Sequence, residues 1–530
     1  MSESPVDTSA GLAAAQERGD WATCVRMLEE SWLTLMFHGD FGVLSRVAFS
    51  LPAAVRRASP LAGTLAEMFG AAPIGTVPLH VPTERAEIEG LAASDDLREF
   101  VGRVCLAVMA RRLQGRPRAA CAMARAAAEV VGRAPLMGLG LSPGPMPGNN
   151  VTDLKTFFYL QAGLAAQLAD DPGTARWALG AAWRERAHDR SGFAARGAAL
   201  RYAVDAALAG EPESAKDWMV RADQQPRTSA FAESIAARGS DLVDFIVALD
   251  TLDPDEMEKT AAALDGVSER EEQWAFVVWA LARHAVLCGE PEQALVLVEQ
   301  VEALFPRNCE GDGVHPGLVA MARGEAELAL GRGNRALAAV SATRPTTYFG
   351  RLTEARVALL AGDDERARAV VVAMTADADL TRRARVEGLL IQAVAELRLG
   401  LPHAAATAQR VTGMLTARGP TSALLGVPRA ALDELAAAVP EAAPLAARRA
   451  ALHRPDVYPA SVELVRLTER ERAVLEQLDR ETTREDIARA LFVSENTVKS
   501  QVRSLYAKLG ATSRAEAVLR AREWGLLADA

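Results

Sequence analysis

The chain has 530 residues, 50% of them hydrophobic and 24% charged, which is enough for several domains or for one extended repeat array. The formal net charge of −10 argues against a protein that coats nucleic acid or an anionic membrane along its whole length, so any contact with a polyanion must be local. The N-terminus lacks a basic, apolar leader and no apolar run reaches bilayer length, which predicts a cytoplasmic protein without a membrane partner.

From about residue 10 to 440 the chain repeats a pattern that is typical of helical hairpins. Each copy has an apolar helix, a glycine, often a proline two residues later, and an alanine five positions after the glycine, as at Gly115, Gly210, Gly289 and Gly400. Glycine suits a left-handed helix end, proline suits the first turn of the next helix, and alanine permits a close crossing. The copies recur at intervals of roughly 30 to 40 residues, with one double interval around residue 250, as in a solenoid.

These hairpins predict an all-α superhelix over residues 1–438 that resembles tetratricopeptide repeats in architecture. The period of about 34 residues and the signature aromatic positions of that repeat are largely absent. A stack of hairpins exposes a concave surface, and such surfaces bind peptides, partner proteins or a small inducer. The sequence leaves open which of these binds at the array.

Three segments rich in glycine, proline or polar residues interrupt the helical pattern, namely 70–82, 134–150 and 306–316. Lids over a binding site and ordinary loops between hairpins both fit this composition, and ordinary loops are favoured. A fourth segment, 439–462, contains four prolines, which interrupt helices and keep a chain extended. It predicts a loose linker to the last domain. The arginines of this linker are candidates for added phosphate contacts.

Residues 463–530 predict four short helices, because each start carries a hydroxyl residue as N-cap. Three of these residues have an acid three positions later, which is the spacing of a capping box. The pairs are Thr468 with Glu471, Thr483 with Asp486, and Ser513 with Glu516. Ser494 caps the third helix after a connection of about three residues, and so short a connection is typical of a helix-turn-helix.

The helix that follows Ser494 has one apolar and one polar face. Its apolar stripe consists of Val498, Val502, Leu505 and Leu509. Lys499, Ser500 and Arg503 lie off this stripe and face outward, on a ridge of the width that a major groove admits. Between positions 494 and 522 the chain has six Lys or Arg residues against two Glu, so this end of the domain is basic.

Residues 463–526 resemble the C-terminal DNA-binding domain of LuxR-type helix-turn-helix regulators. The matching motifs are Leu467-Thr468-Glu469-Arg470-Glu471, Glu485-Asp486-Ile487-Ala488, Thr497-Val498-Lys499, Lys508-Leu509-Gly510 and Ser513-Arg514. The run from Leu491 to Lys499 is especially similar to the large helical-repeat activators of this family. Their nucleotide-binding module is missing, because no G-x-x-x-x-G-K-[ST] motif occurs. Two positions depart from the family pattern, with Glu481 where glycine is common and Gln501 where histidine is frequent.

The resemblance implies sequence-specific binding to double-stranded operator DNA. Lys499, Ser500 and Arg503 would reach base edges, since Lys and Arg donors match the acceptors of guanine. The phosphate contacts would come from Asn496, Thr497, Gln501, Lys508 and Arg514, and Ser494 is a further DNA-binding residue. A homodimer on DNA is expected, with an interface on the last helix. Its residues would be Val518, Ala521 and Trp524. RNA polymerase is a further candidate partner.

No pattern in the chain predicts an active site. The motifs H-E-x-x-H, G-x-S-x-G and G-x-G-x-x-G are absent in their required contexts, the seven histidines are scattered, and the five cysteines show no ligand spacing. We therefore expect no catalytic residue, no metal and no cofactor. Two functions remain open: a transcription regulator whose array senses an inducer or a partner protein, and an adaptor whose array binds a protein while its DNA-binding domain is weak or non-specific.

Overall fold

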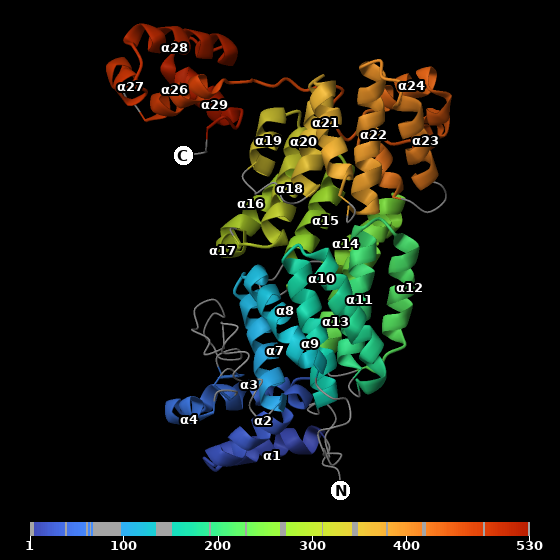
Figure 1. Cartoon of the computed structure of the whole chain (residues 1–530), viewed down its shortest axis with the longest axis vertical. Helices are drawn as coiled ribbons and strands as arrows, with labels where there is room; N and C mark the ends of the chain where they lie inside the picture. The colour runs from blue at the N-terminus through green and yellow to red at the C-terminus, as the bar shows by residue number, and fades with distance from the viewer. Residues whose placement is uncertain are drawn as a thin grey trace.

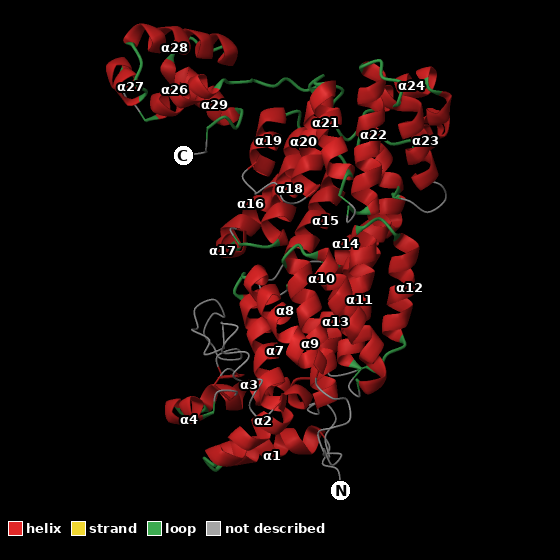
Figure 2. Ribbon diagram, viewed as in Figure 1, coloured by secondary structure: helices red, strands yellow, loops and turns green. Residues whose placement is uncertain are grey.

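The helices form an elongated stack of antiparallel pairs, and a small bundle follows at the C-terminal end (Figure 1). In this computed structural model no strand occurs among the residues described below, and the prediction of an all-α fold is confirmed (Figure 2). The description covers residues 5–527 except 38–39, 60–61, 64, 67–96, 134–150, 190–191, 228–229, 265–271, 310, 342–347, 378–379, 416–419 and 481–482. Within that part of the chain, no helix combines the length and the apolar character that a membrane crossing requires.

The helices fall into an array and a terminal bundle. The first part of the array contains α1 (Pro5–Glu17), α2 (Trp21–Phe37), α3 (Phe41–Ser50), α4 (Ala53–Ala58), α7 (Leu97–Leu113), α8 (Pro117–Arg133), α9 (Val151–Leu168), α10 (Pro172–Arg184), η2 (Glu185–His188), α11 (Phe193–Leu208) and α12 (Pro212–Asp223). The second part contains α13 (Ala230–Thr251), α14 (Pro254–Ala263), α15 (Trp274–Leu287), α16 (Pro291–Leu304), α17 (Pro306–Cys309), α18 (Val314–Ala329), α19 (Gly333–Ser341), α20 (Tyr348–Leu360), α21 (Asp364–Thr375), α22 (Arg382–Arg398) and α23 (Ala404–Leu415). Then come η3 (Thr421–Leu425), α24 (Arg429–Ala438), η4 (Pro440–Ala442) and α25 (Ala443–Ala451), followed by the bundle of α26 (Glu469–Asp479), α27 (Arg484–Ala490), α28 (Glu495–Leu509) and α29 (Arg514–Glu523).

The hairpin turns lie at the glycines that the repeated pattern marks. Gly115, Gly210, Gly289 and Gly400 all adopt φ values between 66° and 83°, the left-handed region that glycine enters without a steric penalty. Leu252 makes the equivalent turn between α13 and α14 with φ 60°, inside the double interval where the pattern predicts one. Proline opens α8, α12 and α16, and the alanine five positions after the glycine is fully buried in each of them.

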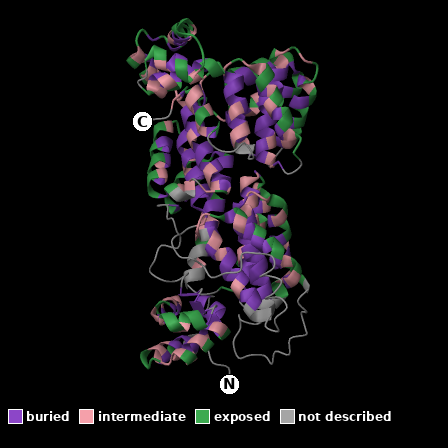
Figure 3. Ribbon diagram, turned by 60° about the vertical axis from the view of Figure 1, so that its left-hand side comes forward, coloured by how far each residue is buried: buried purple, intermediate pink, exposed green. Residues whose placement is uncertain are grey.

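Burial separates the inner helices of the array from the outer ones. Helices α11, α15, α18 and α22 are buried along most of their length, whereas α12, α16 and α21 keep an exposed outer face (Figure 3). The inner helices α15, α18, α20 and α22 contact one another in succession. Side chains that lie far apart in the sequence therefore meet along this inner layer. A relationship to tetratricopeptide repeats beyond this stacking stays a prediction.

Two of the three interrupting segments, 70–82 and 134–150, lie outside the described residues. The third, 306–316, contains the one-turn helix α17 and the start of α18. It therefore connects two neighbouring helices of the array, as an ordinary inter-hairpin connection does.

The prediction of an extended linker over 439–462 is wrong in its first half. Residues 440–451 form η4 and α25, and Leu445 is buried against the array. Arg449 is 1% exposed and donates to Asp456 at 2.8 Å, so it is not available to DNA, while the partly exposed Arg454 donates to the carbonyl of Leu252. The prolines were misinterpreted as helix breakers, because Pro444 lies in the first turn of α25, where a missing N–H costs nothing.

Candidate nucleic-acid interface

Each of the four helices of the bundle begins at a residue whose side chain caps it. Thr468 and Thr483 form reciprocal capping boxes at α26 and α27, and Ser494 accepts the amide of Thr497 at α28. At α29, Ser513 accepts the Glu516 amide, but the Glu516 carboxylate accepts from Thr512 instead of closing the box. Each N-cap contributes about 1 kcal/mol, so these short helices have fixed starts that do not depend on the array.

A compact apolar core holds α28 in place. Its predicted stripe is confirmed as buried, since Val498, Val502, Leu505 and Leu509 are all at most 6% exposed. They share a core with residues of α26, α27 and α29, and the small Ala488 of α27 is 7% exposed where α27 and α28 cross. The outward face of α28 is therefore presented by a rigid support, which base recognition requires.

The turn between α27 and α28 exposes an apolar side chain that the sequence analysis did not single out. Phe492 is 96% exposed and adopts φ 53°, a left-handed conformation that is rare for an aromatic residue. The amide of the next residue, Val493, donates to the carbonyl of Ala488 and closes the turn. The two apolar residues before the N-cap Ser494, Phe492 and Val493, were the available signal.

The outward face of α28 carries the residues expected to read bases. Lys499, Ser500 and Arg503 are exposed, and within the described part of the chain none of their side chains has a hydrogen bond or an ion pair. Ser494 and Asn496 are exposed, and Thr497 and Gln501 are half-buried beside them at the start of the helix. The structure thus brings together seven of the nine predicted DNA-contacting residues on one surface, which is accessible in the complete chain.

Sequence comparison identifies the family of this bundle. Residues 465–521 match the family model described as bacterial regulatory proteins, luxR family. The spore germination protein GerE of Bacillus subtilis is 41% identical over 61 residues, and these cover 82% of that protein and 12% of this chain. The chain belongs to the luxR family.

Other relatives share the same short region. The transcriptional regulatory protein YdfI of Bacillus subtilis is 49% identical over 61 residues, which are 29% of that protein and 12% of this chain. The CsgBAC operon transcriptional regulatory protein of Escherichia coli is 41% identical over 58 residues, 27% of its length and 11% of this chain. The chain therefore spans less than a third of the length of these two regulators. No solved structure matches the chain.

Two of the predicted phosphate contacts, Lys508 and Arg514, also bond inside the LuxR-type module, which comprises α26–α29. Lys508 Nζ lies 2.6 Å from a carboxylate oxygen of Glu471 and 3.0 Å from the carbonyl of Arg466, and Arg514 Nε donates to the carbonyl of Leu478 at 2.8 Å. Burial opposes ionisation of Glu471, but hydrogen bonds from Lys508, Thr468 and Ser504 outweigh it and lower the pKa of Glu471 to about 2. In this geometry both cations hold helices of the module together.

The predicted dimer residues on α29 are only partly accessible. Ala521 is fully buried in the core of the LuxR-type module, and Val518 and Trp524 are half-buried against that core. The large apolar residue of α29 that is exposed is Leu519, at 58% exposure. The prediction assigned Ala521 to a surface because a helix of ten residues offers too few turns to separate its inner from its outer face by sequence alone.

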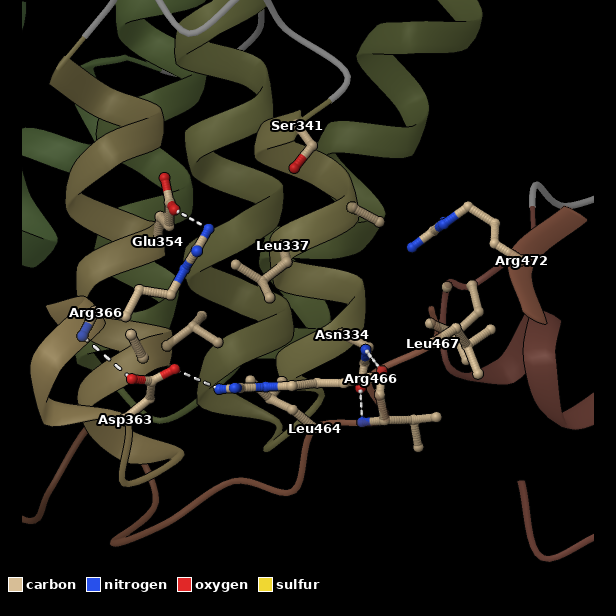
Figure 4. Close-up of a pocket in the computed structure, with 16 residues that line it drawn as sticks. Asn334, Leu337, Ser341, Glu354, Asp363, Arg366, Leu464, Arg466, Leu467 and Arg472 are labelled. Atoms are coloured by element: carbon tan, nitrogen blue, oxygen red, sulfur yellow. Dashed lines mark hydrogen bonds and ion pairs between the residues drawn. The ribbon is translucent and has the colours of Figure 1, made fainter. Parts of the chain in front are cut away.

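The LuxR-type module is attached to the array at a defined position. Asn334 of α19 exchanges two hydrogen bonds with the backbone of Val465, at 2.9 and 3.0 Å, and Arg466 pairs with Asp363 at 2.6 Å. A cleft of about 480 Å³ lies beside these contacts, between α19–α21 and residues 464–472 (Figure 4). Figure 1 shows α28 on the side of the module away from α19 and α20, so this attachment leaves the recognition face open.

Proposed function

We propose that the protein is a transcription regulator that binds a specific operator in double-stranded DNA through α28. The observation that carries this proposal is the set of three exposed, unpaired side chains, Lys499, Ser500 and Arg503, on a capped helix of a LuxR-type module. Lys and Arg at these positions would donate to O6 and N7 of guanine in the major groove. The array, by far the larger part of the chain, would act by binding an inducer or a partner protein rather than by catalysis.

The start of α28 would set the register of the module on DNA. Ser494, Asn496, Thr497 and Gln501 surround the first turn, where unpaired backbone N–H groups and the positive end of the helix dipole favour phosphate oxygens. Such contacts position a protein without reading sequence. Lys508 and Arg514 would join this set by exchanging a bond inside the module for one to a phosphate.

We further propose that the protein binds its operator as a homodimer through α29, with Leu519 and Val518 as the apolar contacts in place of Ala521. Two half-sites about one helical turn apart would follow, which is roughly 34–36 Å along the duplex. RNA polymerase stays a candidate partner of the bound dimer. Analytical ultracentrifugation on operator DNA tests the stoichiometry, and one protomer per operator at saturation would refute the dimer.

The test of the main proposal is selection of bound sequences from a random double-stranded pool by the full-length chain. We expect an enriched motif, and binding to it should weaken steeply as salt rises, because counterions are released from the phosphates. If the bound sequences share no motif, or if all duplexes bind with equal affinity, the remaining function is the adaptor, in which the array binds a protein and the DNA-binding domain is weak or non-specific.

A further inference from the structure

Four buried charges form a cluster on the inner layer of the array. Arg283, Glu325, Arg356 and Glu387 come from α15, α18, α20 and α22, one from each successive inner helix, and each is at most 6% exposed. Glu387 lies 3.0 Å from Arg283 and 2.7 Å from Arg356, and Glu325 lies 3.3 Å from Arg283. The cluster is balanced in charge, and it joins helices that are separated by up to 104 residues in the sequence.

Stability alone does not account for such a cluster. The desolvation of buried ion pairs offsets most of their attraction, and apolar residues of the same volume are often as stable or more so. The donors of the cluster are also incompletely used, because within the described residues Arg283 Nε has no hydrogen-bond partner. The Nε donor of Arg283 can therefore pair with an acceptor from outside the array helices, such as a water or a ligand atom.

Tyr458 already inserts an aromatic ring beside this cluster. It is 6% exposed, its ring lies 4.8 Å from the Arg356 guanidinium carbon, and Arg356 Nη1 donates to its hydroxyl at 3.5 Å. Tyr458 belongs to none of the helices, since it lies in the segment between α25 and the LuxR-type module. Burial raises the pKa of Tyr458, so the hydroxyl stays neutral.

The cavity around Tyr458 is shaped by residues of both the array and that segment. Arg283, Glu325, Arg356 and Glu387 line it together with Gly426 and Tyr458 itself, among others. With the tyrosine in place the cavity has a volume of about 10 Å³, roughly enough for one water molecule. A larger molecule could enter only if a lining side chain moved, and Tyr458 is the largest of those that lie outside the helices.

The same segment attaches the LuxR-type module to the array. Four residues after Tyr458, the Val462 amide donates to the carbonyl of Leu360 at 3.0 Å, and Val465 and Arg466 make the contacts to Asn334 and Asp363 described above. Val462 and Tyr458 also share one apolar cluster with Leu328, Val357 and Leu360. Displacement of the ring would therefore loosen the segment that positions the module.

We propose that this cavity is a small-molecule site for an aromatic ring that carries a hydroxyl or carboxylate oxygen, and that Tyr458 is the built-in occupant that such a molecule displaces. The ring would stack on Arg356 as Tyr458 does, and the oxygen would accept from Arg356 and from the unused Nε of Arg283. The inference rests on the proposed function, because it assigns a chemical class to the inducer and a route from the array to the DNA-binding module.

The decisive experiment measures hydrogen exchange of residues 456–467 in the full-length wild-type chain with and without p-cresol, the tyrosine side chain as a free molecule. We expect exchange at the Val462 and Val465 amides to rise roughly threefold or more with p-cresol, as it would in a locally opened segment. Toluene, which has the ring without the oxygen, should give a smaller effect at equal concentration. Unchanged exchange with p-cresol would overturn the proposal, as would an equal response to toluene.

A second measurement uses the Tyr458→Ala variant with Tyr458→Phe as matched control. p-Cresol should raise the melting temperature of Tyr458→Ala and leave that of Tyr458→Phe unchanged, because only the first has an open site. Equal shifts of the melting temperature in both variants would contradict the proposal. If Tyr458→Ala does not fold, the hydrogen-exchange result for the wild-type chain decides whether the proposal stands. Neither readout contains DNA, so a negative result here is independent of operator binding.

Discussion

Two arginines in the array and two cations in the LuxR-type module lie in opposite environments. In the array, Arg283 and Arg356 are buried and paired on inner helices, whereas in the module Lys499 and Arg503 are exposed and unpaired on an outer face. A paired, buried cation specifies the arrangement of helices around it, while an exposed one is free to meet a polyanion. The contrast explains how a chain with a net charge of −10 presents a local basic surface.

The largest expected effect concerns the exposed pair. Removal of both cations in Lys499→Ala/Arg503→Ala should abolish the difference between operator and random DNA, which is typically about 4–10 kcal/mol for specific binders. The array should remain folded, because neither side chain has a partner among the described residues. Fluorescence anisotropy with operator and scrambled duplexes measures the difference.

The matched control removes one lysine and one arginine elsewhere. Lys259→Ala/Arg429→Ala makes the same change in charge at exposed positions of the array, where the side chains are 72% and 54% exposed. We expect its preference for the operator to equal that of wild type. If both double variants lost preference alike, net charge and not the α28 face would govern binding.

The next effect concerns the buried cluster of the array. Glu387→Leu leaves Arg283 and Arg356 without their closest carboxylate, and breaking a buried pair in this way should lower the free energy of unfolding by about 3–5 kcal/mol. Glu485→Leu is the control, because Glu485 pairs with Arg489 at 3.0 Å but is 70% exposed, and such pairs contribute about 0–1 kcal/mol. Urea denaturation measures both. Similar small losses would mean that water reaches the cluster.

The sequence predicted local features of both regions and missed the long-range ones. Helix starts at Thr468 and Ser494 are encoded within four residues, and the glycine turns within six, so pattern alone locates them. The partner of Lys508 is Glu471 on another helix, a contact that no spacing reveals. The buried cluster was missed for the same reason, since Arg283 and Glu387 meet only when the hairpins stack. The prediction for residues 440–451 is wrong because proline composition outweighed the apolar pattern around Leu445.

A smaller effect concerns the carboxylate that holds Lys508. Glu471→Gln should lower the stability of the module at neutral pH by about 1–3 kcal/mol, the range for hydrogen bonds to a charged group. Because the pKa of Glu471 is lowered to about 2 from an ordinary value of 4.5, its contribution is complete above about pH 4.5 and is lost as the pH falls toward 2. The exchange rates of the α26 and α28 amides, measured at the same pH in Glu471→Gln and in wild type, should therefore differ at neutral pH and become equal in acid. A difference that persisted at pH 2 would exclude ionisation as its cause.

The smallest effects come from two left-handed residues that flank the recognition helix. Gly510 ends α28 with φ 63°, and Gly510→Ala should destabilise the module by about 1 kcal/mol, since that conformation is strained for alanine and its Cβ would lie 2.6 Å from Arg520.

Phe492 precedes α28 with φ 53° and almost full exposure, so Phe492→Gly relieves strain without losing buried contacts. The gain is reduced by the greater freedom of glycine in the unfolded chain, which leaves a net change of at most about 1 kcal/mol in the stabilising direction. Thermal denaturation should therefore show a lower melting temperature for Gly510→Ala and an equal or higher one for Phe492→Gly. A clearly lower melting temperature for Phe492→Gly would show that the Phe492 ring packs on the module in solution.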